Sequence, residues 1–220
     1  MHAPVDKPDR FIDEVATVED DDLLRNDTVG VARQRDFSHR VPYDDAYFDK
    51  YIRYEDQPIA RAINAGRVAI VDKYVGPDAP VLDIGIGSGE FIKNRPNTWG
   101  HDVNPKAIAW LHERKRWSIG FGAFEGFTFW DVLEHVPTPE DYFQRMHEGA
   151  WLFTSLPTFQ DILRIRESKH YRPGEHLYYW TAGGFIWWMM RHGFDLIEMQ
   201  DFETRAGRDN ILTFAFRKSR

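Results

Sequence analysis

The sequence predicts a single α/β domain built on a doubly wound, mostly parallel sheet that ends in an antiparallel strand pair. Short β-branched or aromatic runs alternate with segments of helical periodicity over most of the chain. A glycine-rich turn, residues 85–89, follows the first strong run. The length of 220 residues and the hydrophobic content of 42% suit one hydrophobic core rather than two.

Residues 1–40 are predicted to form an acidic N-terminal arm. Between Met1 and Asp27 there are nine acidic and three basic residues, so most of the net charge of -7 lies here. The segment is polar and has no sustained apolar period, which favours a mobile arm over a functional lid. The remaining residues, 41–220, are nearly neutral and are expected to form the domain.

The elements of the predicted domain follow in a regular order. Residues 41–76 are expected to be helices, because apolar and aromatic residues recur there at helical spacing. Residues 77–220 are expected to hold the sheet core. The expected strands are PVLDIG, TWGHDV, GFTFWD, AWLFTSLP, DLIEMQDF and NILTFAFRK, and the expected helices are FIKN, NPKAIAWLHERKR, PEDYFQRMHEG and TAGGFIWWMMRHG. The last two strands are expected to pair antiparallel.

The composition excludes several kinds of chemistry. The chain has no cysteine, which removes thiolate nucleophiles, disulfides and cysteine-held metal sites. No apolar run approaches the roughly 20 residues of a membrane span, and the first residues lack the charged-then-apolar order of a signal peptide. We therefore expect a cytoplasmic protein without membrane attachment. No feature of the sequence indicates an oligomeric state.

The glycine-rich turn indicates a nucleotide-like ligand. Glycines between a strand and a helix permit a tight turn and close approach of the backbone to a ligand. Gly85, Gly87 and Gly89 read G-x-G-x-G, and Glu90 stands where a dinucleotide-binding loop has its third glycine or alanine. No Lys-Ser or Lys-Thr pair follows, so the pattern of a P-loop is absent as well.

An acidic residue, Asp102, follows the second expected strand. It stands about 20 residues after the first strand, where such folds place a carboxylate that accepts hydrogen bonds from the ribose hydroxyls. An aspartate before Asn-Pro is also a common turn former. The residues alone leave both roles open.

These motifs resemble those of the class I S-adenosylmethionine-dependent methyltransferases. VLDIGIGSGEF is similar to their motif I, and GHDVNPKAIAWL is similar to their second motif. FWDVLEHVPTPEDYF resembles the motif after the fourth strand in the branch that includes ubiquinone-pathway O-methyltransferases. The resemblance covers residues 67–194 and implies a Rossmann-like class I methyltransferase fold. It also implies S-adenosylmethionine as the methyl donor and S-adenosylhomocysteine as the product.

The resemblance implies cofactor contacts position by position. The three glycines match the cofactor turn, Asp83 its orienting carboxylate and Asp102 the ribose ligand. Arg67 matches an arginine near the methionine carboxylate, and Trp130 and Asp131 match positions beside the bound cofactor.

The resemblance is incomplete at the expected adenine site. Between Asp102 and Phe127 the chain is shorter than the family needs for a full third strand with its adenine-contacting acid. Glu125 is the only acidic residue close to the expected position, and we do not assign it this role.

Candidate catalytic residues follow from the chemistry of methyl transfer. The sulfonium already activates the methyl group, so a base is needed only for a hydroxyl or a protonated amine. His135, next to Glu134 at the expected carboxyl edge of the sheet, is placed to act as that base, although a capping or space-filling histidine is the alternative. His176 precedes aromatic residues and resembles the H-x-x-x-[YW] stretch of the small-molecule branch. We therefore prefer it to His170 as the second catalytic histidine.

A metal site is a further implication of the resemblance. In the ubiquinone-pathway branch the matching acidic, glutamate and histidine positions are implicated in binding a divalent metal. Asp131, Glu134 and His135 keep that set. Three oxygen and nitrogen ligands without further support do not lead us to expect a metal.

The acceptor site is expected in the segment after the strand AWLFTSLP, where this class binds its acceptor. The segment contains Lys169, His170, Tyr171 and Arg172, and cationic side chains beside aromatic rings suit an anionic or planar acceptor. A solvated, charged loop has the same composition, so that alternative stays open.

The predicted function is methyl transfer to an oxygen or nitrogen of a small-molecule acceptor. The first alternative is a nucleic-acid base methyltransferase. It is disfavoured because DVLEHV lacks the Asn/Asp-Pro-Pro-Tyr type of loop, no cysteine can attack a pyrimidine, and no basic stripe dominates the chain. The second alternative is a module that binds the cofactor without catalysis.

Overall fold

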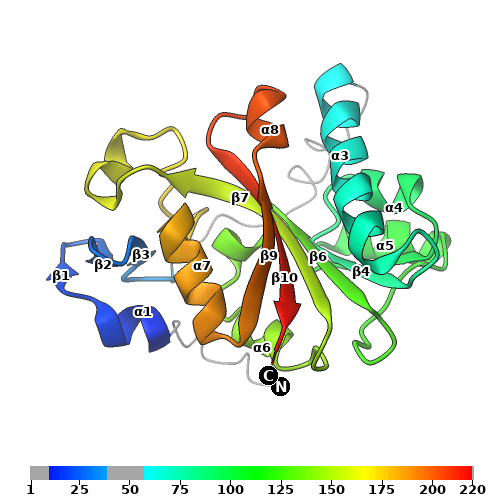
Figure 1. Cartoon of the computed structure of the whole chain (residues 1–220), viewed down its shortest axis with the longest axis horizontal. Coiled ribbons are helices and arrows are strands. Elements are labelled where there is room, and N and C mark those ends of the chain that lie inside the picture. The colour runs from blue at the N-terminus through cyan, green and yellow to red at the C-terminus, as the bar shows by residue number, and fades with distance from the viewer. Residues whose placement is uncertain (1–9, 39–56, 220) are drawn as a thin grey trace.

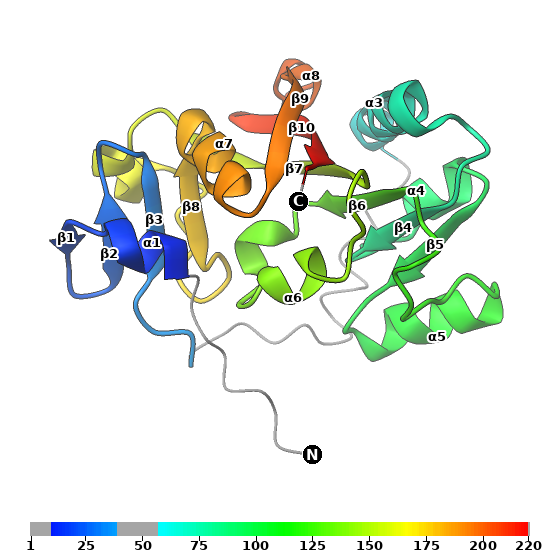
Figure 2. The same cartoon turned by 60° about the horizontal axis from the view of Figure 1, so that its bottom comes forward.

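The computed structural model describes residues 10–38 and 57–219. One ten-stranded sheet runs through them in the order β1-β2-β3-β8-β7-β6-β4-β5, and β10 pairs with both β7 and β9. Helices lie on both faces of this sheet (Figures 1 and 2). The strands are β1 (Val18–Glu19), β2 (Leu23–Asn26), β3 (Val31–Gln34), β4 (Val81–Ile84), β5 (Thr98–His101), β6 (Gly126–Trp130), β7 (Trp151–Phe159), β8 (Tyr178–Thr181), β9 (Phe194–Gln200) and β10 (Ile211–Lys218).

The helices are short apart from α3 and α7. The α-helices are α1 (Arg10–Val15), α3 (Pro58–Val75), α4 (Glu90–Asn94), α5 (Pro105–Glu113), α6 (Glu140–Phe143), α7 (Ala182–Arg191) and α8 (Phe202–Arg205). Two 3-10 helices, η1 (Leu133–His135) and η2 (Ile162–Glu167), complete the described elements. No helix in the described ranges has both the length and the apolar character needed to cross a membrane.

The predicted class I methyltransferase architecture is confirmed. Strands β5, β4, β6 and β7 pair in parallel, and β9 and β10 form the expected antiparallel pair. Asn104 caps α5, because its side chain accepts hydrogen bonds from the backbone amides of Lys106 and Ala107. Pro105 follows at the first position of the helix, where a missing N–H costs nothing.

The two faces of the sheet bury different clusters of side chains. On one face, Ile70 of α3 packs in a cluster with Phe153 of β7. On the other face, Phe185 and Trp188 of α7 pack in a cluster with Phe214 of β10. Because side chains alternate along a strand, a strand buried on both faces is largely apolar, and β6 is buried at all five positions with Thr128 as its only polar residue.

The structure corrects the prediction of an N-terminal arm for residues 10–38. These residues form α1 and the antiparallel strands β1, β2 and β3, and β3 pairs with β8. Ile12, Leu23 and Val31 are fully buried there. Strands of two to four residues carry too few side chains for a sustained apolar period, so the sequence did not reveal them. The rest of the predicted arm lies outside the described residues.

Acidic residues of this segment form ion pairs that the sequence alone did not indicate. Asp20 contacts Arg25, and both Asp20 and Asp22 contact Arg166 of η2. Tyr171 donates a hydrogen bond to Asp22. The acidic run is therefore attached to the segment that follows β7. We call β1, β2, β3 and β8, with α1 and η2, the sheet extension.

Strand β7 joins the extension to the rest of the sheet. Its residues 151–157 pair with β10, and its last two residues, Thr158 and Phe159, pair with β8. Strand β8 was not predicted, because the sequence between β7 and α7 was interpreted as an acceptor-binding segment without strands.

Two helix predictions also need correction. The segment PEDYFQRMHEG forms only the single turn α6, because just two of its apolar side chains, Phe143 and Met146, reach the core. Of the helices predicted within residues 41–76, the structure describes α3, and residues 41–56 lie outside the described part.

Candidate active site

A cavity of about 440 Å³ opens at the carboxyl ends of β4 and β6. Residues 85–88 of the glycine turn form one wall, and α3 forms another with Ile63 and Arg67. Asp83, Trp130 and Asp131 also line it. The volume is in the range of small-molecule and cofactor sites. The structure thus brings most of the predicted cofactor contacts to one place.

The glycine turn depends on backbone conformations that favour glycine. Gly85, Gly87 and Gly89 have φ angles of 74°, 54° and 77°. A Cβ atom on Gly85 would lie 2.6 Å from a methyl carbon of Val132, and one on Gly89 would lie 2.5 Å from the ring of Trp110. Both the conformation and the packing therefore exclude side chains here.

Asp102 supports the glycine turn from the neighbouring strand. Its Oδ2 accepts a hydrogen bond from the backbone amide of Ile86 at 2.9 Å, and its Oδ1 accepts one from Asn104 at 2.8 Å. Asp102 therefore does stabilise the turn before α5. Each carboxylate oxygen can accept more than one hydrogen bond, so the carboxylate can still receive a ribose hydroxyl.

Asp83 lies at the end of β4 with only 1% of its surface exposed. The hydroxyl of Thr128 donates a hydrogen bond to its Oδ1 at 2.6 Å. Burial raises the pKa of Asp83 to about 7, although the hydrogen bond from Thr128 opposes this rise. The carboxyl group therefore titrates close to neutral pH in the protein without a bound ligand.

Four charged side chains form a network at one side of the cavity. Arg67 donates hydrogen bonds to Glu203 at 2.7 Å, to Asp131 at 2.8 Å and to Ser155 at 2.9 Å. Arg208 donates to both oxygens of Asp131 at 2.9 Å. Glu203 is fully buried and accepts from both arginines.

This network balances two positive and two negative charges, which determines what it can bind. Burial would raise the pKa of Asp131, but Arg208 and Arg67 hold it well below its usual range. A group that carries both an ammonium and a carboxylate, as the methionine end of S-adenosylmethionine does, would find complementary charges here. The network is compatible with the role implied for Arg67, which stays a prediction.

Trp130 is the last residue of β6, and Asp131 follows it. Asp131 has a φ of 57°, which is uncommon for a residue other than glycine and directs the chain sharply out of the strand. Trp130 is 7% exposed and packs edge-on against Phe91, and the guanidinium of Arg67 lies 4.9 Å from its ring centre. The indole nitrogen has no hydrogen-bond partner among the described residues.

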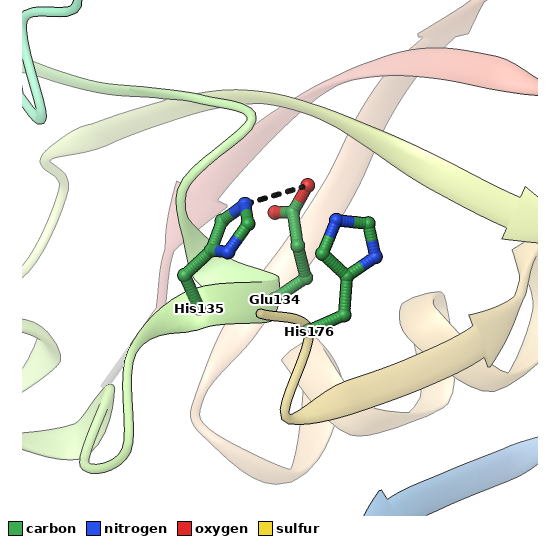
Figure 3. A group of neighbouring side chains, drawn as sticks. All are labelled: Glu134, His135 and His176. Atoms are coloured by element: carbon green, nitrogen blue, oxygen red, sulfur yellow. Dashed lines mark ion pairs between the residues drawn. The ribbon is translucent and has the colours of Figure 1, made fainter. Parts of the chain in front are cut away.

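The three candidate catalytic residues come together beside Asp131. Glu134 and His135 belong to η1, and His176 lies just before β8 (Figure 3). The backbone amide of Leu177 donates to the carbonyl of Glu134 at 2.7 Å and joins the two segments. The rings of His135 and His176 are 4.7 Å apart, and His135 Nε2 is 3.8 Å from Glu134 Oε1. We call these three residues the Glu-His-His cluster.

Burial sets the protonation of the Glu-His-His cluster. It raises the pKa of Glu134 well above its usual range, and the charge of Asp131 adds to the rise. It lowers the pKa of His135, and burial together with the neighbouring His135 imidazole lowers the pKa of His176 to about 3. Both histidines are therefore neutral at pH 7.

The predicted acceptor-binding residues lie in the segment between η2 and β8 and do not line the cavity. Lys169 is ion-paired with Asp209, and His170 hydrogen-bonds the carbonyl of the same residue. Arg172 is ion-paired with Glu175, and Tyr171 contacts Asp22, as described above. These contacts bring the segment close to the loop before β10. Acceptor binding by these four residues stays a prediction.

The adenine end of the expected site has no third strand. Only a single bridge, between Gly100 and Trp117, stands in its place. Glu125 lies at the amino end of β6, where its amide donates to the carbonyl of Pro80. This is the opposite end of the strand from the cavity, which supports leaving Glu125 out of the adenine site.

Sequence reasoning missed two members of the charge network, Arg208 and Glu203, and also Ser155, which accepts a hydrogen bond from Arg67. Arg208 lies between α8 and β10, Glu203 lies in α8, and Ser155 lies in β7. Ser155 lies beside Thr154 in β7, and two neighbouring hydroxyl residues in a largely apolar strand were not interpreted as a site. Arg208 and Glu203 carried no signal, because charged residues near the end of a chain are ordinary surface residues in most sequences.

Comparisons with known proteins agree with this geometry. A family model described as "Methyltransferase domain" matches residues 51–199. No curated protein sequence matches the chain.

Solved structures of low sequence identity share the fold. One is a 1,6-didemethyltoxoflavin-N1-methyltransferase from Burkholderia thailandensis with bound 1,6-didemethyltoxoflavin and S-adenosylhomocysteine, with 16% identity, a TM-score of 0.56, and coverage of 80% of this chain and 84% of that chain. Another is the N-methyltransferase NodS from Bradyrhizobium japonicum with S-adenosylhomocysteine, with 17% identity, a TM-score of 0.53, and coverage of 80% and 100%. A third is magnesium protoporphyrin IX methyltransferase from Synechocystis with bound S-adenosylhomocysteine, with 15% identity, a TM-score of 0.52, and coverage of 80% and 96%.

The family match covers more than half of the chain and includes the glycine turn, Asp102 and all three residues of the Glu-His-His cluster. The cavity, the strained glycines and the fold fit the cofactor that this family uses. The chain therefore belongs to the methyltransferase domain family and is an S-adenosylmethionine-dependent methyltransferase.

Proposed function

We propose that the enzyme transfers the methyl group of S-adenosylmethionine to an oxygen or nitrogen of a small-molecule acceptor held next to the Glu-His-His cluster. The observation that carries this proposal is the position of the cluster. It begins three residues after Asp131, which lines the cofactor cavity, and it gathers two neutral imidazoles and a carboxyl group. We also place the enzyme in the ubiquinone-pathway O-methyltransferase-like branch, on the strength of the DVLEHV motif.

The chemistry needs few groups from the protein. The acceptor atom forms a bond to the methyl carbon while the bond from that carbon to sulfur breaks. The electron pair of the broken bond stays on sulfur, which leaves S-adenosylhomocysteine. A hydroxyl or ammonium acceptor must also lose a proton, and a neutral imidazole of the cluster can accept it. Alignment and exclusion of water supply the rest of the rate.

Two further observations support a small acceptor. The body of the chain is nearly neutral and has no dominant basic stripe, so it offers little attraction for a nucleic-acid backbone. Structural neighbours with this fold include an enzyme crystallised with the small heterocycle 1,6-didemethyltoxoflavin. The buried cluster suits a compact acceptor rather than a duplex.

The proposal is tested by incubating the full chain with S-adenosylmethionine labelled in the methyl group. The acceptors are a panel of phenols, catechols, carboxylic acids and amines, with RNA and DNA in parallel reactions. We expect label in at least one small acceptor. Label in nucleic acid alone would refute the proposal. Normal binding of S-adenosylhomocysteine with no labelled acceptor in the panel or in a metabolite extract would instead favour a cofactor-binding module.

The role of the cluster is tested with His135→Ala. Loss of an acid–base group lowers kcat by about 100-fold or more, while the affinity for S-adenosylhomocysteine should stay within about twofold. His112→Ala is the matched control, because His112 is exposed on α5. Equal activity of the two variants would show that the cluster has no role in catalysis.

A further inference from the structure

The Glu-His-His cluster has the composition and spacing of a metal site. One ligand atom from each of Glu134, His135 and His176 can be chosen so that all three lie within 4.8 Å of one another. Figure 3 shows the carboxylate of Glu134 between the two imidazole rings. Donor atoms bound to a single Zn²⁺ at about 2.0–2.2 Å lie about 3–4 Å apart, so small side-chain rotations would bring the three together.

Two atoms of the cluster are buried without a hydrogen-bond partner in the described part of the chain. They are Oε2 of Glu134 and Nδ1 of His176, and the two residues are 2% and 4% exposed. Leaving a buried polar atom unpaired costs about 1–3 kcal/mol, so such atoms usually have a function or an occupant. A cation placed between them would satisfy both atoms at once.

The orientation of His135 is fixed in a way that suits a metal ligand. Its Nδ1 lies 2.7 Å from the carbonyl oxygen of Glu175. Because a carbonyl can only accept, Nδ1 must carry the proton, and the neutral ring then has its lone pair on Nε2. This nitrogen is the one that faces Glu134. In many metal sites a backbone carbonyl accepts a hydrogen bond from the ring nitrogen that does not bind the metal, and so fixes the orientation of the ligating histidine.

Asp131 does not belong to this group, although the resemblance to the ubiquinone-pathway branch implies it as a ligand. Both of its oxygens accept hydrogen bonds from Arg208, and one also accepts from Arg67. A metal ion at Asp131 would have to displace these arginines or approach their positive charges. The ligand set Asp131, Glu134 and His135 is therefore not assembled in this structure.

We propose that Glu134, His135 and His176 bind one divalent transition-metal ion, with His176 in the place that the resemblance gave to Asp131. Two imidazoles and one carboxylate match the ligands of catalytic zinc sites and of facial-triad iron sites, which keep positions open for other ligands. The catalytic meaning of the site rests on the proposed function, but metal binding itself does not.

The metal would also narrow the acceptor class. A divalent ion lowers the pKa of an oxygen acid that it coordinates, so it favours a hydroxyl acceptor over an amine. When the metal is bound, the two histidines act as ligands rather than as proton acceptors. The metal-bound hydroxyl would then already have a lowered pKa and would need no strong base. We therefore expect a phenol or catechol among the acceptors.

Metal binding is tested on the full chain after treatment with a chelator. Zn²⁺ is titrated by calorimetry, and Co²⁺ is followed by its visible absorption, which reports the ligand field. We expect one ion per chain, with the affinity reduced at least about 100-fold in Glu134→Gln and His176→Ala. His170→Ala is the matched control, because His170 lies in the same segment but outside the cluster. It should bind metal like the unchanged protein.

A fourth variant, Asp131→Asn, separates the two ligand sets. It should retain the metal affinity within about threefold, whereas a strong loss together with full binding by His176→Ala would overturn the proposal. The melting temperature shows for every variant that the protein is folded, and binding of S-adenosylhomocysteine shows the same for the variants of the cluster and for His170→Ala. Weak Zn²⁺ binding that none of the cluster variants changes would also overturn it.

The outcomes distinguish this inference from the proposed function. Methyl transfer to a small acceptor that survives chelation, in a protein that binds no metal at the cluster, overturns the metal site and leaves the proposed function standing. The opposite result is one bound ion per chain that is lost in His176→Ala, together with label transferred only to nucleic acid. It would support the metal site and overturn the proposed function.

Discussion

The cofactor side of the sheet and the sheet extension differ in how their contacts are spaced along the chain. On the cofactor side, the glycine turn and its supporting residue Asp102 are only 16 residues apart at their direct hydrogen bond. In the extension, Val31 of β3 pairs with Trp180 of β8, across most of the chain. Short-range contacts leave patterns in a sequence, whereas long-range pairing does not.

The two regions also differ in what stabilises them. The cofactor side contains the buried network of Arg67, Asp131, Glu203 and Arg208. The extension is held mainly by backbone pairing and apolar burial, and its ion pairs include exposed ones such as Arg166 with Asp22. Substitutions should therefore affect the two regions through different interactions.

The largest effect is expected for Glu203→Gln in the charge network. Glu203 is fully buried against two arginines, and its neutralisation leaves positive charge uncompensated. We expect the free energy of unfolding to fall by about 3–5 kcal/mol, measured by urea denaturation. Glu198→Gln, at the partly exposed pair with Lys73, is the control and should cost under about 1 kcal/mol. Similar values for the two would mean that the network does not stabilise the cofactor side.

The second prediction tests whether the extension is part of the folded domain. Leu23 of β2 is fully buried, so Leu23→Ala should lower the free energy of unfolding by about 2–5 kcal/mol in a single transition. Leu163→Ala is the matched control in η2, where Leu163 is 62% exposed, and should change it by less than about 0.5 kcal/mol. An unchanged free energy of unfolding in Leu23→Ala would instead support the prediction of a mobile N-terminal arm.

A third prediction concerns the glycine turn. Gly85→Ala places a methyl group 2.6 Å from Val132 and in an unfavourable backbone conformation, so the affinity for S-adenosylhomocysteine should fall about tenfold or more. Gly183→Ala in α7 meets no atom within 4 Å and should leave that affinity unchanged. Calorimetric titration measures both. An unchanged affinity for S-adenosylhomocysteine in Gly85→Ala would mean that the cofactor does not bind at the glycine turn.

A fourth prediction is a pH dependence from Asp83, which is small at any one pH step. Its pKa is raised to about 7 in the folded state, so between about pH 4 and pH 7 the folded protein holds a proton that the unfolded chain has lost. Its contribution to stability is therefore present below that range and is lost as the pH rises through 7, by at most about 1.4 kcal/mol per pH unit. Asp83→Asn should remove this slope, as urea denaturation at several pH values would show. An identical slope in the variant would assign it to another group.

The cofactor side was predictable from the sequence because its signals are local. Asp83, the three glycines and Asp102 occupy one strand-turn-helix-strand unit, and the capping Asn104 with Pro105 marks the start of α5. His135 and His176 were chosen as a pair, and the structure brings them within 4.7 Å between ring centres.

The remaining features could not be predicted, for physical reasons. Strands β1 to β3 are too short for a detectable period, and β3 pairs with β8, a strand far along the chain. The ion pair of Arg208 with Asp131 joins residues separated by 77 positions, and no local pattern accompanies it. Such pairs depend on the tertiary structure alone.

The most direct test of the account is a crystal structure with S-adenosylhomocysteine bound. The ribose should lie at Asp102, the methionine end at the network of Arg67 and Arg208, and the sulfur should face His135 and His176. A cofactor outside the glycine turn, or a sulfur atom that faces Lys169 and leaves the Glu-His-His cluster on the far side, would contradict the proposed site.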